Sequence, residues 1–246
     1  MSAPAVEVVD VWKSFRLPHQ RRDTLKERFL HPRRQTDVEQ LVAVKGASFA
    51  VAQGEFFGII GHNGSGKSTL LKLIAEIYVP DRGELVVRGR LSPFVELGVG
   101  FNEELSARDN VRVNGALLGL TLKQIEDRYD EIVAFAGLER FMDQKLKNFS
   151  SGMKVRLAYS VSIRVDFEIL LLDEVLAVGD QEFQDKCFET LEDIRAQGKT
   201  IIFVSHDMDA MEEHCDRVMH IDHGEIVAIG SPDEVVDRYR STVSVL

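Results

Sequence analysis

A phosphate-binding loop at residues 61–68 constrains this chain more than any other feature of its sequence. The segment reads GHNGSGKS and matches the pattern G-x-x-x-x-G-K-[ST] at every fixed position. It follows a short apolar run at residues 55–60 and precedes apolar residues at helical spacing over residues 69–78. Such a loop turns backbone N–H groups toward phosphate oxygens, and the start of the helix attracts the same negative charge. The sequence therefore predicts a nucleotide site between a buried strand and a helix.

The residue types in this loop predict separate roles in nucleotide binding. We expect Lys67 to neutralise the β- and γ-phosphates of ATP and the Ser68 hydroxyl to bind Mg²⁺. Further contacts with the nucleotide are expected from Gly61, His62, Asn63, Gly64, Ser65, Gly66 and Thr69.

A second apolar run, at residues 169–172, ends in two carboxylates, Asp173 and Glu174. A buried strand that ends in a carboxylate predicts that Asp173 lies beside the metal ion. Glu174, one residue later, is placed to polarise the water that attacks the γ-phosphate. Without the phosphate-binding loop, the same pair would indicate only surface charge.

Strand and helix patterns alternate along most of the chain. Strands are predicted at 83–89, 90–97, 200–204, 217–221 and 225–229, the last two joined by a hairpin turn at residues 222–224. Helices are predicted at 126–141, 183–194 and from 231 onward. A more helical stretch runs from about residue 100 to 165. This order predicts an α/β fold with a mainly parallel sheet, an antiparallel β portion and an inserted helical lobe. We expect one domain over 1–246, with its core at about 1–95 and 165–246 and the helical lobe at about 96–164.

Composition excludes several other classes of protein. The chain has 246 residues and a net charge of −10, so we expect no nucleic-acid partner. Its two cysteines, Cys187 and Cys215, indicate reduced thiols and a cytosolic setting. No apolar stretch approaches the ~18 residues that cross a bilayer, so any pore is expected from another chain.

Positive charge gathers in an insertion at residues 17–39, although the whole chain is acidic. Eight basic and two acidic residues lie between Lys13 and Arg34. Two readings stay open: a solvated surface loop, or a patch that faces phosphates or anionic lipid headgroups.

Four further segments resemble those of one protein family. FSSGM at 149–153 stands where the family signature LSGGQ would be, and residues 177–180 resemble its D-loop. Residues 204–207 resemble its switch-histidine segment, and Phe15 stands where its members stack an aromatic ring on adenine. From residue 6 to 235, the chain resembles the nucleotide-binding subunit of ATP-binding-cassette (ABC) transporters, which implies a RecA-like P-loop NTPase fold and an ATPase.

The resemblance also implies a head-to-tail dimer, in which each ATP lies between the phosphate-binding loop of one copy and the signature of the other. The residues carried over are Ser150, Ser151, Gly152, Met153 and Asp180 for the nucleotide, and His206 for catalysis. Simpler readings remain: Phe15 as a core residue, Ser150 as an ordinary helix cap, and His206 as a buried histidine at a strand end.

Segments 98–111, 147–160 and 170–187 resemble the subfamily that exports lipid-linked surface polysaccharides such as O-antigen, teichoic acid or galactan. This implies a multi-span permease partner at the cytoplasmic face of a bacterial inner membrane. Some members of the subfamily carry a C-terminal carbohydrate-binding domain, and we expect none within these 246 residues. The family's Q-loop glutamine, which contacts Mg²⁺, is missing from this sequence, and Glu96 is the candidate for its role. The alternative interpretation is that Glu96 is an exposed carboxylate at the end of a strand. Residues expected to receive the permease, or else to form ordinary core, are Leu105, Val111, Val113 and Leu117.

Other functions fit the sequence less well. ABC ATPases that act on DNA or ribosomes carry a long coiled coil or two fused cassettes, and this chain has neither. A simple P-loop kinase lacks the signature and the switch histidine. A module that holds nucleotide without turnover would lack Glu174 or His206, and both are present.

Overall fold

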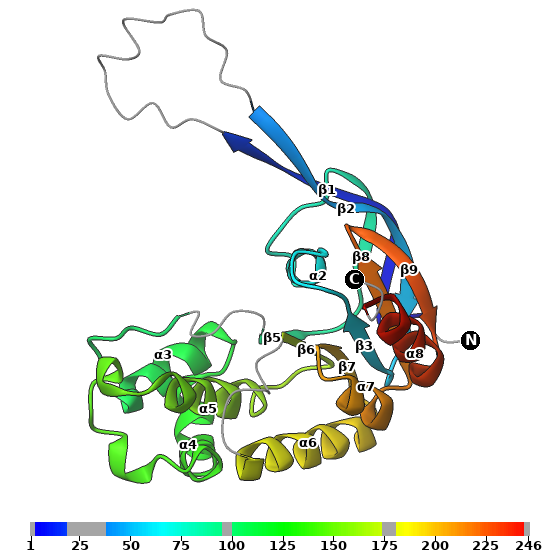
Figure 1. The fold of residues 1–246 in the computed structure, drawn as a ribbon. Helices are drawn as coiled ribbons and strands as arrows, with labels where there is room; N and C mark the ends of the chain where they lie inside the picture. The colour runs from blue at the N-terminus through cyan, green and yellow to red at the C-terminus, as the bar shows by residue number, and fades with distance from the viewer. Residues whose placement is uncertain (1–2, 19–37, 95–99, 174–180, 244–246) are drawn as a thin grey trace, which may run out of the picture.

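The computed structural model describes residues 3–18, 38–94, 100–173 and 181–243 (Figure 1). In chain order its elements are β1 (Val6–Pro18), β2 (Val38–Val51), β3 (Phe56–Ile60), α2 (Lys67–Ile74), β4 (Arg82–Val87), β5 (Leu91–Phe94), α3 (Ala107–Leu117), α4 (Leu122–Ala136), the 3-10 turns η1 (Glu139–Phe141) and η2 (Leu146–Asn148), α5 (Ser151–Ser162), β6 (Ile169–Asp173), α6 (Gln181–Ala196), β7 (Thr200–Val204), α7 (Met208–His214), β8 (Arg217–Asp222), β9 (Glu225–Gly230) and α8 (Pro232–Val243).

The main sheet has the strand order β5-β6-β7-β3-β8-β9. Its first five strands are parallel, and β9 pairs antiparallel with β8 as the hairpin turn at residues 222–224 predicts. β3 and β7 are buried along their whole length, which explains their continuous apolar sequences. The predicted mainly parallel α/β sheet is confirmed.

Alternate residues of the central strands enter two separate cores. Phe57 and Ile59 of β3 pack with α2 and with the smaller antiparallel sheet β2-β1-β4. Phe56 and Ile60, on the other face of β3, pack with helices α3 to α8. The helix that follows the phosphate-binding loop is thereby enclosed between two sheets (Figure 1).

Helices α3, α4 and α5 pack against one another and form the predicted helical insertion. The bounds predicted for α4 were wrong, because Thr121 and Gln124 form a capping box that starts it at Leu122. Gly137 then ends it in a left-handed conformation, at a φ of 65°. Helix α2 also ends earlier than predicted, at Ile74, and Glu76 takes a φ of 58° just beyond it.

The strands β1 and β2 form a long antiparallel ribbon that extends past α2 (Figure 1). They pair as far as Pro18 and Val38, so both ends of the 17–39 insertion belong to strands rather than to a loop. Residues 19–37 lie outside the described part of the chain, and both readings of their charge stay predictions.

Cys187 and Cys215 are free and buried, in agreement with the predicted thiols. Burial raises the pKa of each thiol to about 12, so neither forms a reactive thiolate at neutral pH. Among the described residues, no helix combines the length and apolar composition needed to cross a membrane.

Candidate functional site

Three central strands bring the predicted site residues to one edge of the main sheet. β3 leads into the phosphate-binding loop, β6 ends at Asp173, and β7 leads to His206. Val204 of β7 is level with Asp173 on one side and with Ile59 on the other. Because parallel strands end at the same edge, segments far apart in the sequence meet there.

The phosphate-binding loop is crowded by neighbouring backbone at two of its three glycines, Gly61 and Gly66. A side chain at Gly66, which has a φ of 112°, would place its Cβ 2.4 Å from the carbonyl oxygen of Ala43. Gly66 also begins α2 without any side-chain cap, which leaves the first amides of the helix for a ligand. These features fit the loop to an anionic group.

Lys67 is held close to this loop. Its side chain is buried, and its ammonium donates hydrogen bonds to the carbonyl oxygens of Gly61 at 2.7 Å and His62 at 3.1 Å. Ser65 is also buried, and its hydroxyl has no hydrogen-bond partner within the described chain. The loop therefore offers amide, hydroxyl and ammonium donors, which are the groups that a polyphosphate requires.

A cavity of about 390 Å³ opens beside the loop, a volume typical of sites for small molecules. Its lining comes from both ends of the sequence: Phe15, Leu41, Val42, Ala43, Lys45, Asn63, Gly64, Gly66, Lys67, Ser68, Thr69, His223 and Gly224. Sequence analysis missed the contribution of β2 and of the β8–β9 turn. The turn signal at residues 222–224 was read only as a hairpin, although it follows a strand of the parallel sheet.

Phe15 lies on the wall of this cavity rather than in either core cluster. It is half-buried, and its ring meets Tyr78 edge-on with the centroids 5.3 Å apart. The two residues before Phe15 on β1 are held in place by Asp81, which accepts hydrogen bonds from the Ser14 hydroxyl at 2.8 Å and from Lys13 at 3.0 Å. These hydrogen bonds lower the pKa of Asp81, with that from Ser14 contributing most. The Lys13 ammonium also lies over the Phe15 ring, 5.7 Å from its centroid, so the ring borders the cavity in a fixed setting.

The signature segment lies apart from this cavity. Ser150 caps α5, and its hydroxyl accepts a hydrogen bond from the Met153 amide at 3.2 Å. Ser150 and Ser151 are exposed, and Gly152 is half-buried. None of the residues 150–153 lines the cavity.

The other predicted residues are only partly placed. His206 is exposed, which excludes its reading as a buried histidine at a strand end. Leu105, Val113 and Leu117 are exposed as well, whereas Val111 is core. Glu96, Glu174 and Asp180 lie outside the described residues.

The β8–β9 turn braces the phosphate-binding loop, and this predicts an effect on stability. Gly224 donates its amide to Ser65 O at 2.8 Å, and an added Cβ at Gly224 would lie 2.8 Å from Ala43 O. Gly224 and Gly119 share a left-handed conformation, with φ of 82° and 92°, but Gly119 has open space around it. Gly119→Ala should therefore cost only the conformational strain, about 1–2 kcal/mol of unfolding free energy. Gly224→Ala should cost more in urea unfolding, and equal losses would contradict a close approach at the turn.

Comparison with known proteins now decides the family. A family model described as ABC transporter matches residues 44–177, more than half of the chain. The chain belongs to the ABC transporter family. Its resemblance to ABC nucleotide-binding subunits is therefore confirmed.

Three relatives show where the chain stands within the ABC family. It is 43% identical over 99% of its length to the O-antigen export system ATP-binding protein RfbB of Myxococcus xanthus, of which it spans 57%. It is 38% identical over 98% of its length to the RfbB protein of Klebsiella pneumoniae and spans 99% of that relative. It is also 36% identical over 95% of its length to the teichoic acids export ATP-binding protein TagH of Bacillus anthracis, of which it spans 42%.

Solved structures of ABC cassettes share the fold. A dimeric cassette, MJ0796, in a post-hydrolysis state bound to ADP and Pi, superposes with a TM-score of 0.75 at 22% identity. The superposition covers 92% of this chain and 98% of that one. The predicted P-loop NTPase fold is confirmed.

Proposed function

We propose that this chain binds and hydrolyses ATP to drive a membrane permease that exports a lipid-linked cell-surface polysaccharide of the O-antigen, teichoic acid or galactan type. The observation that carries the ATPase part is the cavity beside the phosphate-binding loop, which Lys67 and Phe15 approach from separate elements. The printed names of the RfbB and TagH relatives support the export part.

The residues divide the work according to their chemistry. Lys67 and the loop amides hold the phosphates, and Phe15 stacks on the adenine ring. Ser68 and Asp173 would hold Mg²⁺, which would supply positive charge at the phosphates. Glu174 accepts the proton of the attacking water. His206, which follows strand β7, is the second residue that takes part in catalysis.

A second copy of the chain completes the site. A triphosphate is strongly anionic and needs donors on every side, whereas the cavity beside the loop is open to solvent on one side. We infer that Ser150, Ser151, Gly152 and Met153 of one copy contact the nucleotide held by the other, and that Asp180 also contributes to nucleotide binding. The exposed, uncrowded start of α5 supports this arrangement, since a Cβ at Gly152 would have its nearest contact at 3.9 Å.

The permease docks on the helical part of the chain, at the cytoplasmic face of the membrane. Glu96 replaces the Q-loop glutamine in relaying the nucleotide state, and Leu105, Val113 and Leu117 offer exposed apolar surface.

Deleting the gene in its native host tests this export function. We expect surface polysaccharide to disappear while its lipid-linked form accumulates inside the cell. Intact surface polysaccharide in the deletion strain would contradict the proposed export function.

Phe15→Ala tests whether the ring binds the base. We expect ATP affinity to fall by about 1–3 kcal/mol, which is the scale of one base–aromatic stack. GTP affinity should fall similarly because stacking tolerates either base, as measured by competition with a fluorescent nucleotide. Phe15→Tyr keeps the aromatic face and is the matched control. Unchanged affinity in folded Phe15→Ala would assign the ring to packing alone.

A further inference from the structure

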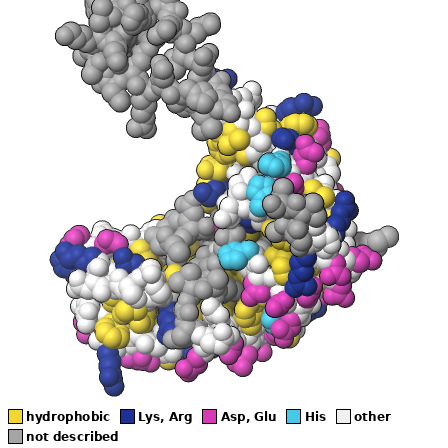
Figure 2. Space-filling model, viewed as in Figure 1, with side chains coloured by type: hydrophobic (Ala, Val, Ile, Leu, Met, Phe, Trp, Pro, Cys, Tyr) yellow, Lys and Arg dark blue, Asp and Glu magenta, His cyan; other side chains and the backbone are white. Residues whose placement is uncertain are grey.

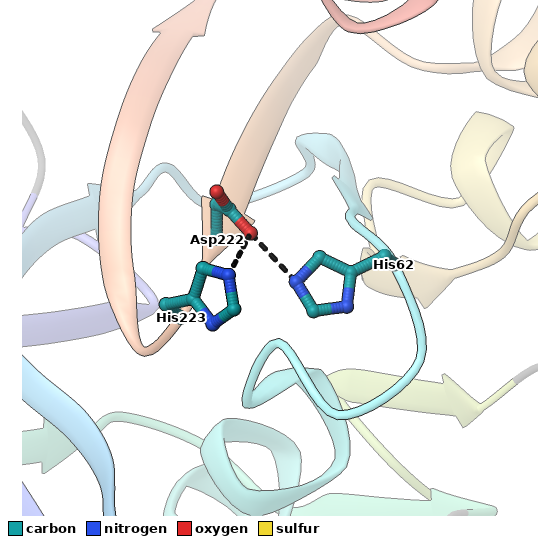
Figure 3. A group of neighbouring side chains, drawn as sticks. All are labelled: His62, Asp222 and His223. Atoms are coloured by element: carbon teal, nitrogen blue, oxygen red, sulfur yellow. Dashed lines mark ion pairs between the residues drawn. The ribbon is translucent and has the colours of Figure 1, made fainter. Parts of the chain in front are cut away.

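A group of two histidines and one aspartate lies at the edge of the main sheet, beside the phosphate-binding loop. β3 and β8 are neighbouring parallel strands, and Ile60 pairs with His220. His62 follows Ile60 by two residues, and Asp222 follows His220 by two, so both reach the same edge. Histidine side chains gather on the open face of the molecule in Figure 2, and Figure 3 shows His62, Asp222 and His223 pointing toward one another.

The distances within this group suit a metal ion. Asp222 Oδ1 lies 2.7 Å from His62 Nε2 and 3.9 Å from His223 Nε2. The three ligand atoms all lie within 4.8 Å of one another. A tetrahedral zinc ion with bonds of about 2.0–2.1 Å sets its ligand atoms about 3.3 Å apart. Small side-chain rotations therefore bring these three atoms to bonding distance around one ion.

Two short contacts orient the His62 ring toward Asp222. His62 Nδ1 lies 2.7 Å from the carbonyl oxygen of Asn63, which only accepts, so Nδ1 carries the proton. The other ring nitrogen, Nε2, faces the Asp222 carboxylate, so a metal ion placed between them would contact both groups. Asp222 Oδ1 is shielded from solvent and is paired with His62 Nε2. A histidine that donates through Nδ1 to a carbonyl is also the usual state of a metal ligand.

The backbone on both sides of the group is fixed. The amide of Gly224, next to His223, donates to Ser65 O at 2.8 Å, and the Lys45 amide donates to Gly224 O at 2.8 Å. The ligands therefore sit on two backbone segments that are already bound to each other. Such a frame lowers the entropy cost of assembling a metal site.

We propose that His62, Asp222 and His223 form a binding site for a divalent transition-metal ion of the zinc class, which links the phosphate-binding loop to the β8–β9 turn. Two imidazoles with one carboxylate select such ions, whereas Mg²⁺ prefers oxygen ligands. The site is distinct from the Mg²⁺ position proposed at Ser68 and Asp173. His62 and His223 are exposed, so water completes the coordination.

Zinc titration of the full chain, without a histidine tag, tests this site. The protein is stripped of metal with a chelator and titrated without nucleotide or Mg²⁺, in competition with a chromophoric chelator. We expect one Zn²⁺ per chain, and at least tenfold weaker binding in Asp222→Asn and in His223→Asn. Zn²⁺ should also raise the melting temperature of the wild type but not of these variants.

Two variants serve as matched controls for this titration. His31→Asn removes a histidine from the basic insertion, and Asp173→Asn removes the carboxylate proposed for Mg²⁺, so both should keep the wild-type zinc affinity. Equal affinity in the wild type and in His223→Asn would overturn the proposal, as would a wild type that binds no Zn²⁺. The side chain of His223 is 78% exposed, so its replacement should not prevent folding even if Asp222→Asn does.

Discussion

Glu174→Gln should give a protein that binds ATP normally but hydrolyses it about 10²–10⁴-fold more slowly. Glutamine keeps the shape of the side chain and removes the carboxylate that accepts a proton from the attacking water. Release of phosphate under saturating ATP and Mg²⁺ measures the rate, and competition with a fluorescent nucleotide measures the affinity.

The matched control for this variant is Glu189→Gln, which changes an exposed carboxylate on α6. It should hydrolyse ATP at the wild-type rate. A rate for Glu174→Gln within about threefold of the wild type would exclude Glu174 as the base, because a positioned base contributes far more.

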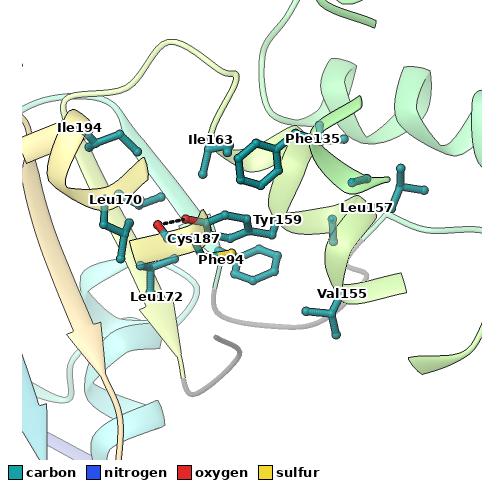
Figure 4. Packing of buried hydrophobic residues seen from close by; sticks show 14 of the residues in the cluster. Phe94, Phe135, Val155, Leu157, Tyr159, Ile163, Leu170, Leu172, Cys187 and Ile194 are labelled. Carbon is teal, nitrogen blue, oxygen red and sulfur yellow. Dashed lines mark hydrogen bonds between the residues drawn. The ribbon is translucent and has the colours of Figure 1, made fainter. Parts of the chain in front are cut away.

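Tyr159→Ala should lower the free energy of unfolding by about 3–5 kcal/mol. Tyr159 is fully buried on α5, and its ring packs against Phe94, Phe135 and Phe183 at centroid distances of 5.7, 5.9 and 6.2 Å (Figure 4). Alanine leaves a cavity at the junction of the helices with the main sheet. Urea unfolding should show a lower midpoint and an unchanged m-value.

Tyr159→Phe separates the ring from its hydroxyl. The hydroxyl donates to the carbonyl oxygen of Cys187 at 3.4 Å, a long hydrogen bond whose loss should cost about 0.5–1.5 kcal/mol. If both variants lost the same free energy, the ring packing would not be the source of stability at this position.

Local sequence patterns predicted most strands of the main sheet well because each carries its own apolar signal, whereas β1 (Val6–Pro18) was not predicted. Residues 200–204 were predicted with the observed bounds, and the hairpin at residues 217–229 was predicted to within one residue at each outer end. Helix ends were predicted less well. The capping pair Thr121 and Gln124 was present in the sequence but went unused, and the end of α2 at Ile74 has no glycine or proline to mark it.

The candidate site was predictable where a motif runs along the chain, and not where separate segments meet. Residues 61–69 form one such motif, and six of the nine line the cavity. Lys45, His223 and Gly224 reach the cavity because β2 contacts the β8–β9 turn, through the hydrogen bond from Lys45 N to Gly224 O. No motif or periodicity within either segment predicts that contact. The roles of Glu96, Glu174 and Asp180 stay predictions.

The position of β3 in the middle of the sheet has a consequence for biosynthesis. Its two neighbours are β7 and β8, and Thr200 at the start of β7 follows Ile60 by 140 positions. At a synthesis rate of about 5–20 residues per second, β3 leaves the ribosome roughly 7–28 s before either partner exists. During that interval its five apolar residues have no strand to pair with. A slowing of translation between β3 and β7 would therefore lengthen the time for which this apolar strand is exposed to aggregation.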